Sequence, residues 1–218
     1  MSEENKKFMD NKTLEDITVD DLLKEMMNNT GELKDLEAVS ATKDAVDRTM
    51  LLGDIDEVSA EAASHLIRFW NLADKDIDPK DRKPIKLLID SSGGWLEGGL
   101  MIADAIRLSK TPVYTINMGI AYSAGLLVFI AGHRRFCYPS STFLFHEGST
   151  CLGMMDAGKF RNYAAFYEQI LLKAKKYFLE YTDITEEFYQ EKYKDDYWFF
   201  AEEAIERGFC DEILEEFI

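Results

Sequence analysis

One stretch of the sequence constrains the fold more than any other: a serine among small residues, followed by a long apolar run. Ser123 lies within Gly119–Gly125, and the segment Leu126–Gly132 carries no charge. The segment Pro112–Met118 alternates as a buried strand does, and the apolar run is long enough for a short buried helix. The pattern therefore predicts a strand that leads through Ser123 into a buried helix.

A serine at such a junction has two interpretations. Helix N-termini carry free N–H groups that favour developing negative charge, and small neighbours let a carbonyl group approach the backbone. These are the surroundings that a nucleophilic serine requires. The same pattern also describes a serine that only caps a core helix, because Ser is a common N-cap residue. The remainder of the chain decides between the two.

Composition excludes several classes of protein. The chain has 218 residues, 46% of them hydrophobic, which suffices for one core. Its formal net charge of −16 argues against nucleic acid and anionic membranes as partners. The three cysteines are widely spaced, so we expect neither a disulfide framework nor a zinc site, and no cofactor. Without a signal peptide or a membrane-length apolar run, a cytoplasmic protein is expected.

Two parts of the chain differ in composition. Residues 1–45 are polar and highly charged, and we expect them to form a partly helical N-terminal extension. Residues 46–218 form the expected globular domain. Within it, buried-strand patterns at Ile85–Asp90 and Pro112–Ile116 alternate with helical patterns, which predicts right-handed βαβ units and a mostly parallel sheet. The predicted class is α/β, with a long helix over about Lys159–Tyr181.

A serine nucleophile needs a base with a pKa near neutrality, and the chain has three histidines. His65 lies within a predicted helix. His133 lies in a turn beside Arg134 and Arg135, whose charges would oppose the imidazolium that must form. His146 ends a predicted strand, where a parallel sheet presents its functional groups, and is the best candidate base. A structural histidine at a strand end is the alternative.

The segment Ser91–Gly94 offers hydrogen-bond donors for the same chemistry. It leaves a predicted strand, and its two glycines let backbone N–H groups point outward without a Cβ in the way. With the N–H of Ala124 they can form an oxyanion hole. An ordinary Gly-Gly turn before a helix is the alternative. Phosphate-loop spacings are absent, and the hydrolase elbow G-x-S-x-G is not matched, because Ala121 replaces its first glycine.

Five segments together resemble the proteolytic subunit of the Clp protease family, serine peptidases of the crotonase-like superfamily. In chain order they are Ile89–Gly94, Gly119–Gly125, Phe136–Ser141, Phe143–His146, and Ala201–Ala204 with Gly208. The resemblance covers about Asp47 to Leu214. It implies an α/β crotonase-like ββα spiral with a mostly parallel sheet and a protruding strand–helix handle, to which this chain adds a helical N-terminal extension.

The resemblance also implies roles for individual residues. Ser123 matches the nucleophile, His146 the general base, and Asp196 the acid of a catalytic triad, with Asp195 as the alternative acid. The implied reaction is peptide-bond hydrolysis through an acyl-enzyme.

Further backbone positions match the family's binding groups. Gly94 and Ala124 match the two oxyanion N–H donors, and Gly93, Trp95 and Leu96 match the backbone that binds an extended substrate strand. The family forms two stacked heptameric rings, and a ring ATPase feeds it unfolded chains. The implied partners are therefore unfolded polypeptides, further copies of this chain in a ring or stacked tetradecamer, and a ring ATPase unfoldase.

The chain departs from the family's pattern in several respects. His146–Gly148 replaces His-Gln-Pro, Ser149–Met155 replaces a Gly- and Gln-containing handle segment, and Lys86 takes an aromatic position of the ATPase-docking pocket. Glu147, Gly148 and Lys86 motivate an alternative, a catalytically inactive ring subunit that serves as scaffold or regulator, although the complete Ser-His-Asp set argues against it. A crotonase-type acyl-CoA enzyme would share the fold, but it does not need the Ser-His-Asp order. A phage-type maturation peptidase that works without an ATPase is a further alternative.

Overall fold

The computed structural model describes residues 47–148 and 156–218. The chain divides into two units, Met1–Thr49 and Met50–Ile218. The elements described below belong to the second unit, apart from the first residue of the first strand. The predicted N-terminal extension, residues 1–45, and the predicted handle segment Ser149–Met155 lie outside the described residues. Within the described ranges, no helix is long and apolar enough to cross a membrane.

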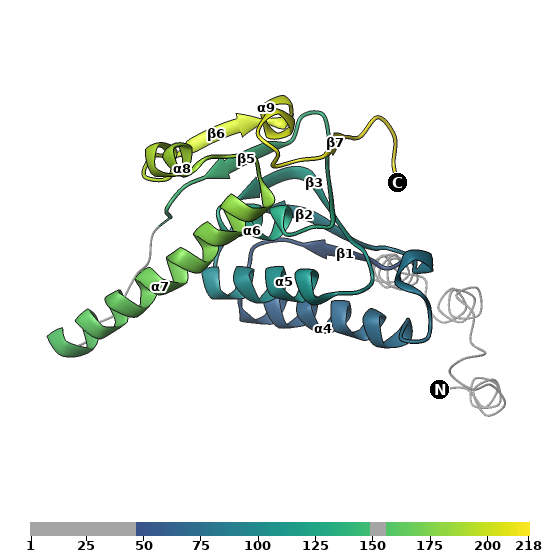
Figure 1. Ribbon diagram of the computed structural model, residues 1–218, viewed down its shortest axis with the longest axis horizontal. Helices are drawn as coiled ribbons and strands as arrows, with labels where there is room; N and C mark the ends of the chain where they lie inside the picture. Colours follow the sequence, from purple (N-terminus) through teal and green to yellow (C-terminus); the bar gives the residue numbers. More distant parts are fainter. Residues whose placement is uncertain (1–46, 149–155) are drawn as a thin grey trace, which may run out of the picture. The chain divides into compact units, whose positions relative to one another are not determined.

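A seven-stranded sheet organises the second unit (Figure 1). Its main path runs β1–β2–β3–β4–β7, and β5 and β6 branch from β3. The pairings of β3 with β2, β4 and β5 are parallel, whereas β6 runs antiparallel to β5. The predicted α/β class and mostly parallel sheet are therefore confirmed. The strands are β1 Thr49–Leu52, β2 Ile85–Ser91, β3 Val113–Tyr122, β4 Arg134–Cys137, β5 Thr142–Phe145, β6 Tyr197–Phe200 and β7 Glu212–Ile213.

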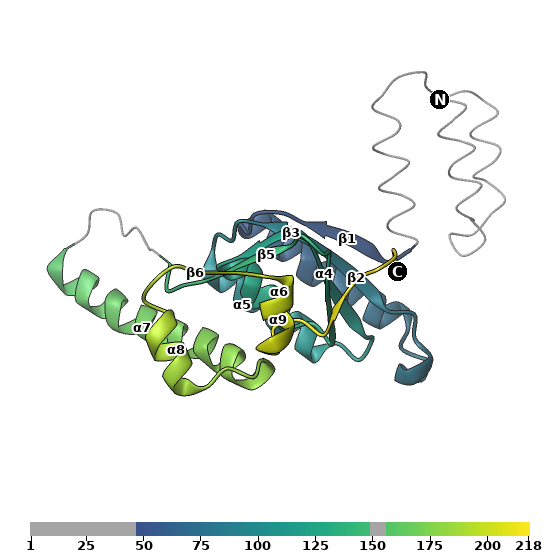
Figure 2. The same cartoon turned by 90° about the horizontal axis from the view of Figure 1, so that it is seen from above.

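Helices pack against this sheet, and one of them lies entirely in the core. All seven residues of α6 are buried, which explains why the sequence after Ser123 is a continuous apolar run. α5 packs between α4 and α6 (Figures 1 and 2). The helices are α4 Glu57–Ala73, α5 Leu96–Leu108, α6 Ala124–Ile130, α7 Ala157–Tyr181, α8 Glu186–Lys192 and α9 Ala201–Glu206, with a 3₁₀ turn η1 at Pro79–Asp81.

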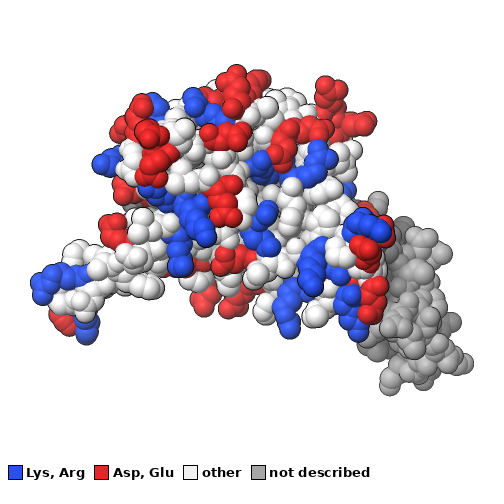
Figure 3. Space-filling model, viewed as in Figure 1, with Lys and Arg blue, Asp and Glu red and all other residues white. Residues whose placement is uncertain are grey.

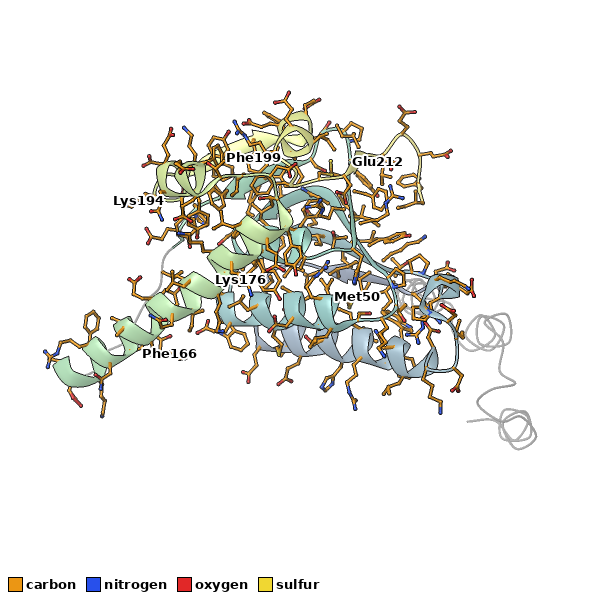
Figure 4. All side chains as sticks on the ribbon, viewed as in Figure 1. Met50, Phe166, Lys176, Lys194, Phe199 and Glu212 are labelled. Carbon is orange, nitrogen blue, oxygen red and sulfur yellow. The ribbon has the colours of Figure 1, made fainter. Side chains whose placement is uncertain are left out.

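The long helix α7 is buried in its C-terminal half alone. Its buried residues are Ile170, Ala174 and Phe178, whereas Phe166 is 60% exposed. In Figures 1 and 2 the N-terminal half of α7 reaches beyond the sheet, and Figure 4 marks Phe166 on this projecting part. The predicted long helix is confirmed, but its apolar stripe does not pack against the core along the whole length.

The strand that leads to Ser123 is longer than its hydrophobic alternation predicted. β3 continues through Gly119 to Tyr122 because its last residues pair with β5, with Tyr122 opposite Leu144. The irregular stretch around Gly119 is held by side chains, since the carboxylate of Asp90 accepts a hydrogen bond from the N–H of Ile120 at 3.2 Å. Long-range pairing thus extends a strand that local sequence would end earlier.

An aromatic core lies under β5. Phe143 is fully buried, with ring centroids 5.3 Å from Phe129 and 5.2 Å from Phe199, whose ring is nearly parallel. Figure 4 marks Phe199 on β6, the strand next to β5. Phe145 packs against Phe178 from α7 at 4.9 Å. Aromatic pairs of this kind add to the free energy gained from burial alone, so β5 is fixed tightly beside the end of β3.

Truncation of Phe143 tests the importance of this core. We expect Phe143→Ala to lower the free energy of unfolding by about 3–5 kcal/mol, because it leaves a cavity among rings that cannot collapse fully. Phe143→Leu, the matched control, should cost about 1 kcal/mol. Urea unfolding at one fixed protein concentration measures both. Equal losses for the two variants would contradict a tightly packed aromatic core.

Candidate active site

Ser123 lies at the junction of β3 and α6, and its backbone is strained. It has φ 54° and ψ −124°, a conformation that residues with a side chain rarely adopt. Its N–H donates a hydrogen bond to the carbonyl of Leu144 at 3.0 Å, which ties the turn to β5. Ser123 occupies the N-cap position of α6, yet its hydroxyl makes no capping hydrogen bond. The side chain therefore serves no helix-capping purpose here.

His146 and Asp196 meet at the end of the β5–β6 ladder. Phe145 of β5 pairs with Tyr197 of β6, so the residues just beyond this pair face each other. The Nδ1 atom of His146 lies 3.0 Å from a carboxylate oxygen of Asp196. Asp195 instead closes a turn, its N–H donating to the carbonyl of Lys192 at 3.3 Å. Of the two candidate acids, the structure brings Asp196 to the histidine.

Ser123 and His146 line one cavity. The Nε2 atom of His146 is buried, and no hydrogen-bond partner for it exists among the described residues. Nε2 and the Ser123 hydroxyl oxygen each lie 3.8 Å from the point that a Cβ on Gly148 would occupy. With Nδ1 held by Asp196, Nε2 is the ring atom left to receive a proton from the serine side.

The loop after β2 brings two glycines against Ser123. Gly93 and Gly94 have φ values of +105° and +130°. A Cβ on Gly93 would lie 2.7 Å from the Cβ of Ser123, and one on Gly94 would lie 2.3 Å from the carbonyl oxygen of Ile55. Only glycine fits both positions. Gly94 lines the cavity together with Ser123 and Ala124, the first residue of α6, whose N–H has no partner within the helix.

The two residues after Gly94 are placed differently. The N–H of Trp95 donates to the carbonyl of Ile55 at 2.8 Å, so this group is already engaged within the chain. Leu96 begins α5 and lines the cavity. Of these two expected substrate-binding positions, Leu96 alone lies at the cavity.

The remaining histidines lie elsewhere. His133 accepts a hydrogen bond from the N–H of Val113 through Nδ1, at 3.1 Å. Its pKa is lowered by burial first and by the charge of Arg107 second, rather than by the adjacent arginines that the sequence suggested. His65 lines a different cavity, formed mainly by α4, α5 and α7. His146 is therefore the histidine that shares a cavity with Ser123.

Three polar residues of this cavity were not identified from sequence as site residues: Glu147, Tyr167 and Tyr193. The N–H of Glu147 donates to the carbonyl of Tyr193 at 2.7 Å, which joins the two sides of the site. Burial, together with the nearby charge of Glu147, raises the pKa of Tyr193 to about 12. The sequence offered one signal for these residues, because Glu147 replaces the glutamine of the family's His-Gln-Pro segment. The two tyrosines reach the cavity only through tertiary packing.

The mostly parallel sheet brings a serine, a histidine–carboxylate pair and glycine N–H groups to one cavity. This arrangement suits acyl transfer by a serine hydrolase. The family model described as Clp protease matches residues 37–217. The ATP-dependent Clp protease proteolytic subunit of Streptococcus mutans is 32% identical over 173 residues, which cover 76% of this chain and 83% of that protein. The proteolytic subunit 2 of Treponema pallidum is 34% identical over 137 residues, which cover 62% and 68%.

The chain therefore belongs to the Clp protease family, which confirms the resemblance carried by the five sequence segments. Membership supports a peptidase role of the serine hydrolase type. It also suggests an oligomeric ring assembly that works with ATPase partners on protein substrates.

Charge removal at the two neighbouring aspartates tests the acid assignment. Asp196→Asn is expected to slow the reaction of Ser123 with a fluorophosphonate at least about a hundredfold, because the amide no longer holds the Nδ1–H tautomer of His146. Asp195→Asn, the matched control, should change the rate less than about threefold. Intact-mass time courses give both rates. The reverse ranking would transfer the role to Asp195.

The strain at Ser123 gives a second prediction. Ser123→Gly should unfold with a free energy about 1 kcal/mol higher than Ser123→Ala, because glycine relieves strain of about 1–3 kcal/mol and loses somewhat more chain entropy on folding. Urea denaturation compares the two variants. At Ala105, within α5, glycine should instead lower stability by about 1 kcal/mol. A Ser123→Gly variant no more stable than Ser123→Ala would contradict the strain.

Proposed function

We propose that this protein is a serine endopeptidase that hydrolyses peptide bonds of unfolded proteins or peptides, as the proteolytic subunit of a self-compartmentalised ring complex. One observation carries the proposal. The His146 imidazole is held by Asp196 through Nδ1 at 3.0 Å, while its Nε2 is buried beside a cavity that Ser123 lines. This is the order of groups that activates a serine hydroxyl.

In the proposed reaction, the hydroxyl oxygen of Ser123 attacks the scissile carbonyl while Nε2 of His146 takes its proton. Asp196 stabilises the imidazolium. The N–H groups of Gly94 and Ala124 stabilise the oxyanion of the tetrahedral intermediate. His146 then protonates the leaving amine, which departs as the C–N bond breaks and an acyl-enzyme remains. A water molecule, deprotonated by His146, attacks the acyl-enzyme. His146 then returns the proton to the oxygen of Ser123 as the C–O bond breaks and the carboxylic acid product leaves. The Ser123–His146 hydrogen bond needed for the first step forms as substrate binds, since such bonds are often long without substrate.

Exposed apolar side chains support the ring assembly. A cavity of about 960 Å³ runs along α4, α5 and α7, and Leu72 and Leu108, which are 53% and 83% exposed, line it. Trp198 and Phe200 of β6 are exposed at a separate place. The face in Figure 3 shows uncharged areas between intermixed Lys, Arg, Asp and Glu side chains. Two different apolar areas suit head-to-tail contacts between copies, which form a ring where the rotation from one copy to the next closes.

A ring ATPase is the proposed partner, since the curated relatives are named as subunits of ATP-dependent proteases. Lys86, at the expected docking pocket, is half-buried, and its ammonium donates to the carbonyl of Ile218 at 2.6 Å. It thereby finds the polar partner that a lysine among apolar groups requires. The neighbouring Leu88 packs against a small apolar cluster that includes Phe136 and Leu214.

Active-site labelling tests the proposed chemistry. A fluorophosphonate should form one adduct, on Ser123, and the adduct should be lost in Ser123→Ala and His146→Ala. Hydrolysis of an unfolded protein substrate should fall at least about a thousandfold in Ser123→Ala while the assembly mass stays unchanged. Retained hydrolysis by that variant would disprove the nucleophile. An assembled ring that neither labels nor cleaves, with or without an ATPase, would support the inactive-subunit alternative.

A further inference from the structure

One carboxylate holds the start of the loop that carries the two glycines beside Ser123. Oδ1 of Asp54 accepts hydrogen bonds from both the backbone N–H and the hydroxyl of Ser92, at 2.9 and 2.7 Å. The bond from the hydroxyl, followed by the bond from the N–H, lowers the pKa of Asp54, so the carboxylate is charged at neutral pH. Asp54 lies between β1 and α4, so this contact joins the segment before α4 to the loop after β2.

The next residue, Ile55, holds the remainder of the same loop. The N–H of Ile55 donates to the carbonyl of Gly93 at 2.7 Å, and the carbonyl of Ile55 accepts from the N–H of Trp95 at 2.8 Å. Ile55 is buried, so these two bonds are shielded from water. Asp54 and Ile55 together therefore fix the loop on both sides of Gly94.

The N–H of Gly94 differs from those of its neighbours in this loop. The N–H groups of Ser92 and Trp95 donate to Asp54 and Ile55, as described above, and that of Gly93 donates to the hydroxyl of Ser91 at 3.1 Å. Among the described residues, no acceptor takes the N–H of Gly94. Gly94 also lines the cavity of Ser123, so its N–H is available as a donor there.

We propose that Asp54 is a positioning residue for the oxyanion hole. It holds Ser92 so that the N–H of Gly94 stays directed at the carbonyl oxygen of the bond that Ser123 attacks. This inference rests on the proposed peptidase function and adds a residue to its machinery. Two consecutive glycines give a loop unusual backbone freedom, and an oxyanion donor is effective only when it is already oriented before the reaction.

Two substitutions at Asp54 separate its hydrogen bonds from its charge. Asp54→Ala removes both bonds, whereas Asp54→Asn removes the charge and keeps Oδ1 as an acceptor. Asp54 is exposed, so neither change opens a cavity in the core. The measurement is the rate at which a fluorophosphonate modifies Ser123. In this reaction Ser123 attacks phosphorus, His146 takes the proton, fluoride leaves, and the phosphoryl oxygen takes the place of the oxyanion.

We expect Asp54→Ala to lower the labelling rate at least about tenfold, because the donor must now be oriented during the reaction. Asp54→Asn should stay within about threefold of the unmodified protein, since it keeps the acceptor. The pH at which the rate of Asp54→Ala changes with the protonation of His146 should not move. Asp54 acts on the glycine loop, whereas the pair of His146 and Asp196 lies at the end of the β5–β6 ladder.

Asp56→Ala is the matched control. The carboxylate of Asp56 accepts a hydrogen bond from the N–H of Ser59 at 2.8 Å, and this bond lowers its pKa as the contact with Ser92 lowers that of Asp54. It caps α4, however, and does not contact the glycine loop. Asp56→Ala therefore removes the same kind of contact and should keep the labelling rate within about twofold.

Three results would overturn the inference while leaving the proposed function intact. They are an Asp54→Ala variant labelled as fast as Asp56→Ala, an Asp54→Asn variant as slow as Asp54→Ala, and a displaced pH dependence. If Asp54→Ala does not fold, Ser92→Ala is compared with Ser59→Ala. Ser92→Ala loses one of the two bonds and should be about threefold slower, and equal rates would overturn the inference. An unmodified protein that is never labelled on Ser123 would overturn the proposed function, and this inference with it.

Discussion

The candidate active site depends on the position of one short strand, β5. On one side β5 runs parallel to the end of β3, and on the other it runs antiparallel to β6. The three strands therefore bring Ser123, His146 and Asp196 to one edge, although these residues are far apart in the chain. Hydrogen bonds fix this register: a slip of one residue would turn each side chain to the opposite face of the sheet.

Packing beneath β5 stabilises an arrangement that is locally unfavourable. Ser123 adopts a strained backbone, and Gly93 and Gly94 adopt conformations closed to other residues. Phe143 and Phe145 bury their rings among aromatic side chains from α6, α7, α8 and β6. The free energy gained from this burial offsets the strain and lets a rigid scaffold hold Ser123 in this conformation. The same packing shapes the cavity beside Ser123, because Phe145 and Phe178 form part of its lining.

Much of the fold followed from local patterns in the sequence. Alternation of buried strands and helices predicted the parallel sheet, and the apolar run after Ser123 predicted a helix whose every residue is buried. Local sequence patterns were insufficient where long-range contacts determine the length or the burial of an element. β3 extends past Gly119 because β5 pairs with it, and much of the stripe on α7 stays exposed because the helix projects beyond the sheet. A hydrophobic pattern among neighbouring residues cannot predict either effect.

The sequence by itself determined which residues can carry the chemistry. The sequence contains a serine among small residues, a histidine after a predicted strand and a pair of glycines. These features alone were enough to select Ser123 and His146 as candidates. Tertiary structure decided which partners they meet. The β5–β6 ladder brings Asp196 rather than Asp195 to His146, and the packing of α7 and α8 places Tyr167 and Tyr193 beside Glu147. Hydrogen-bonded register and side-chain packing act between distant segments, so only the folded chain defines the neighbours of each candidate catalytic residue.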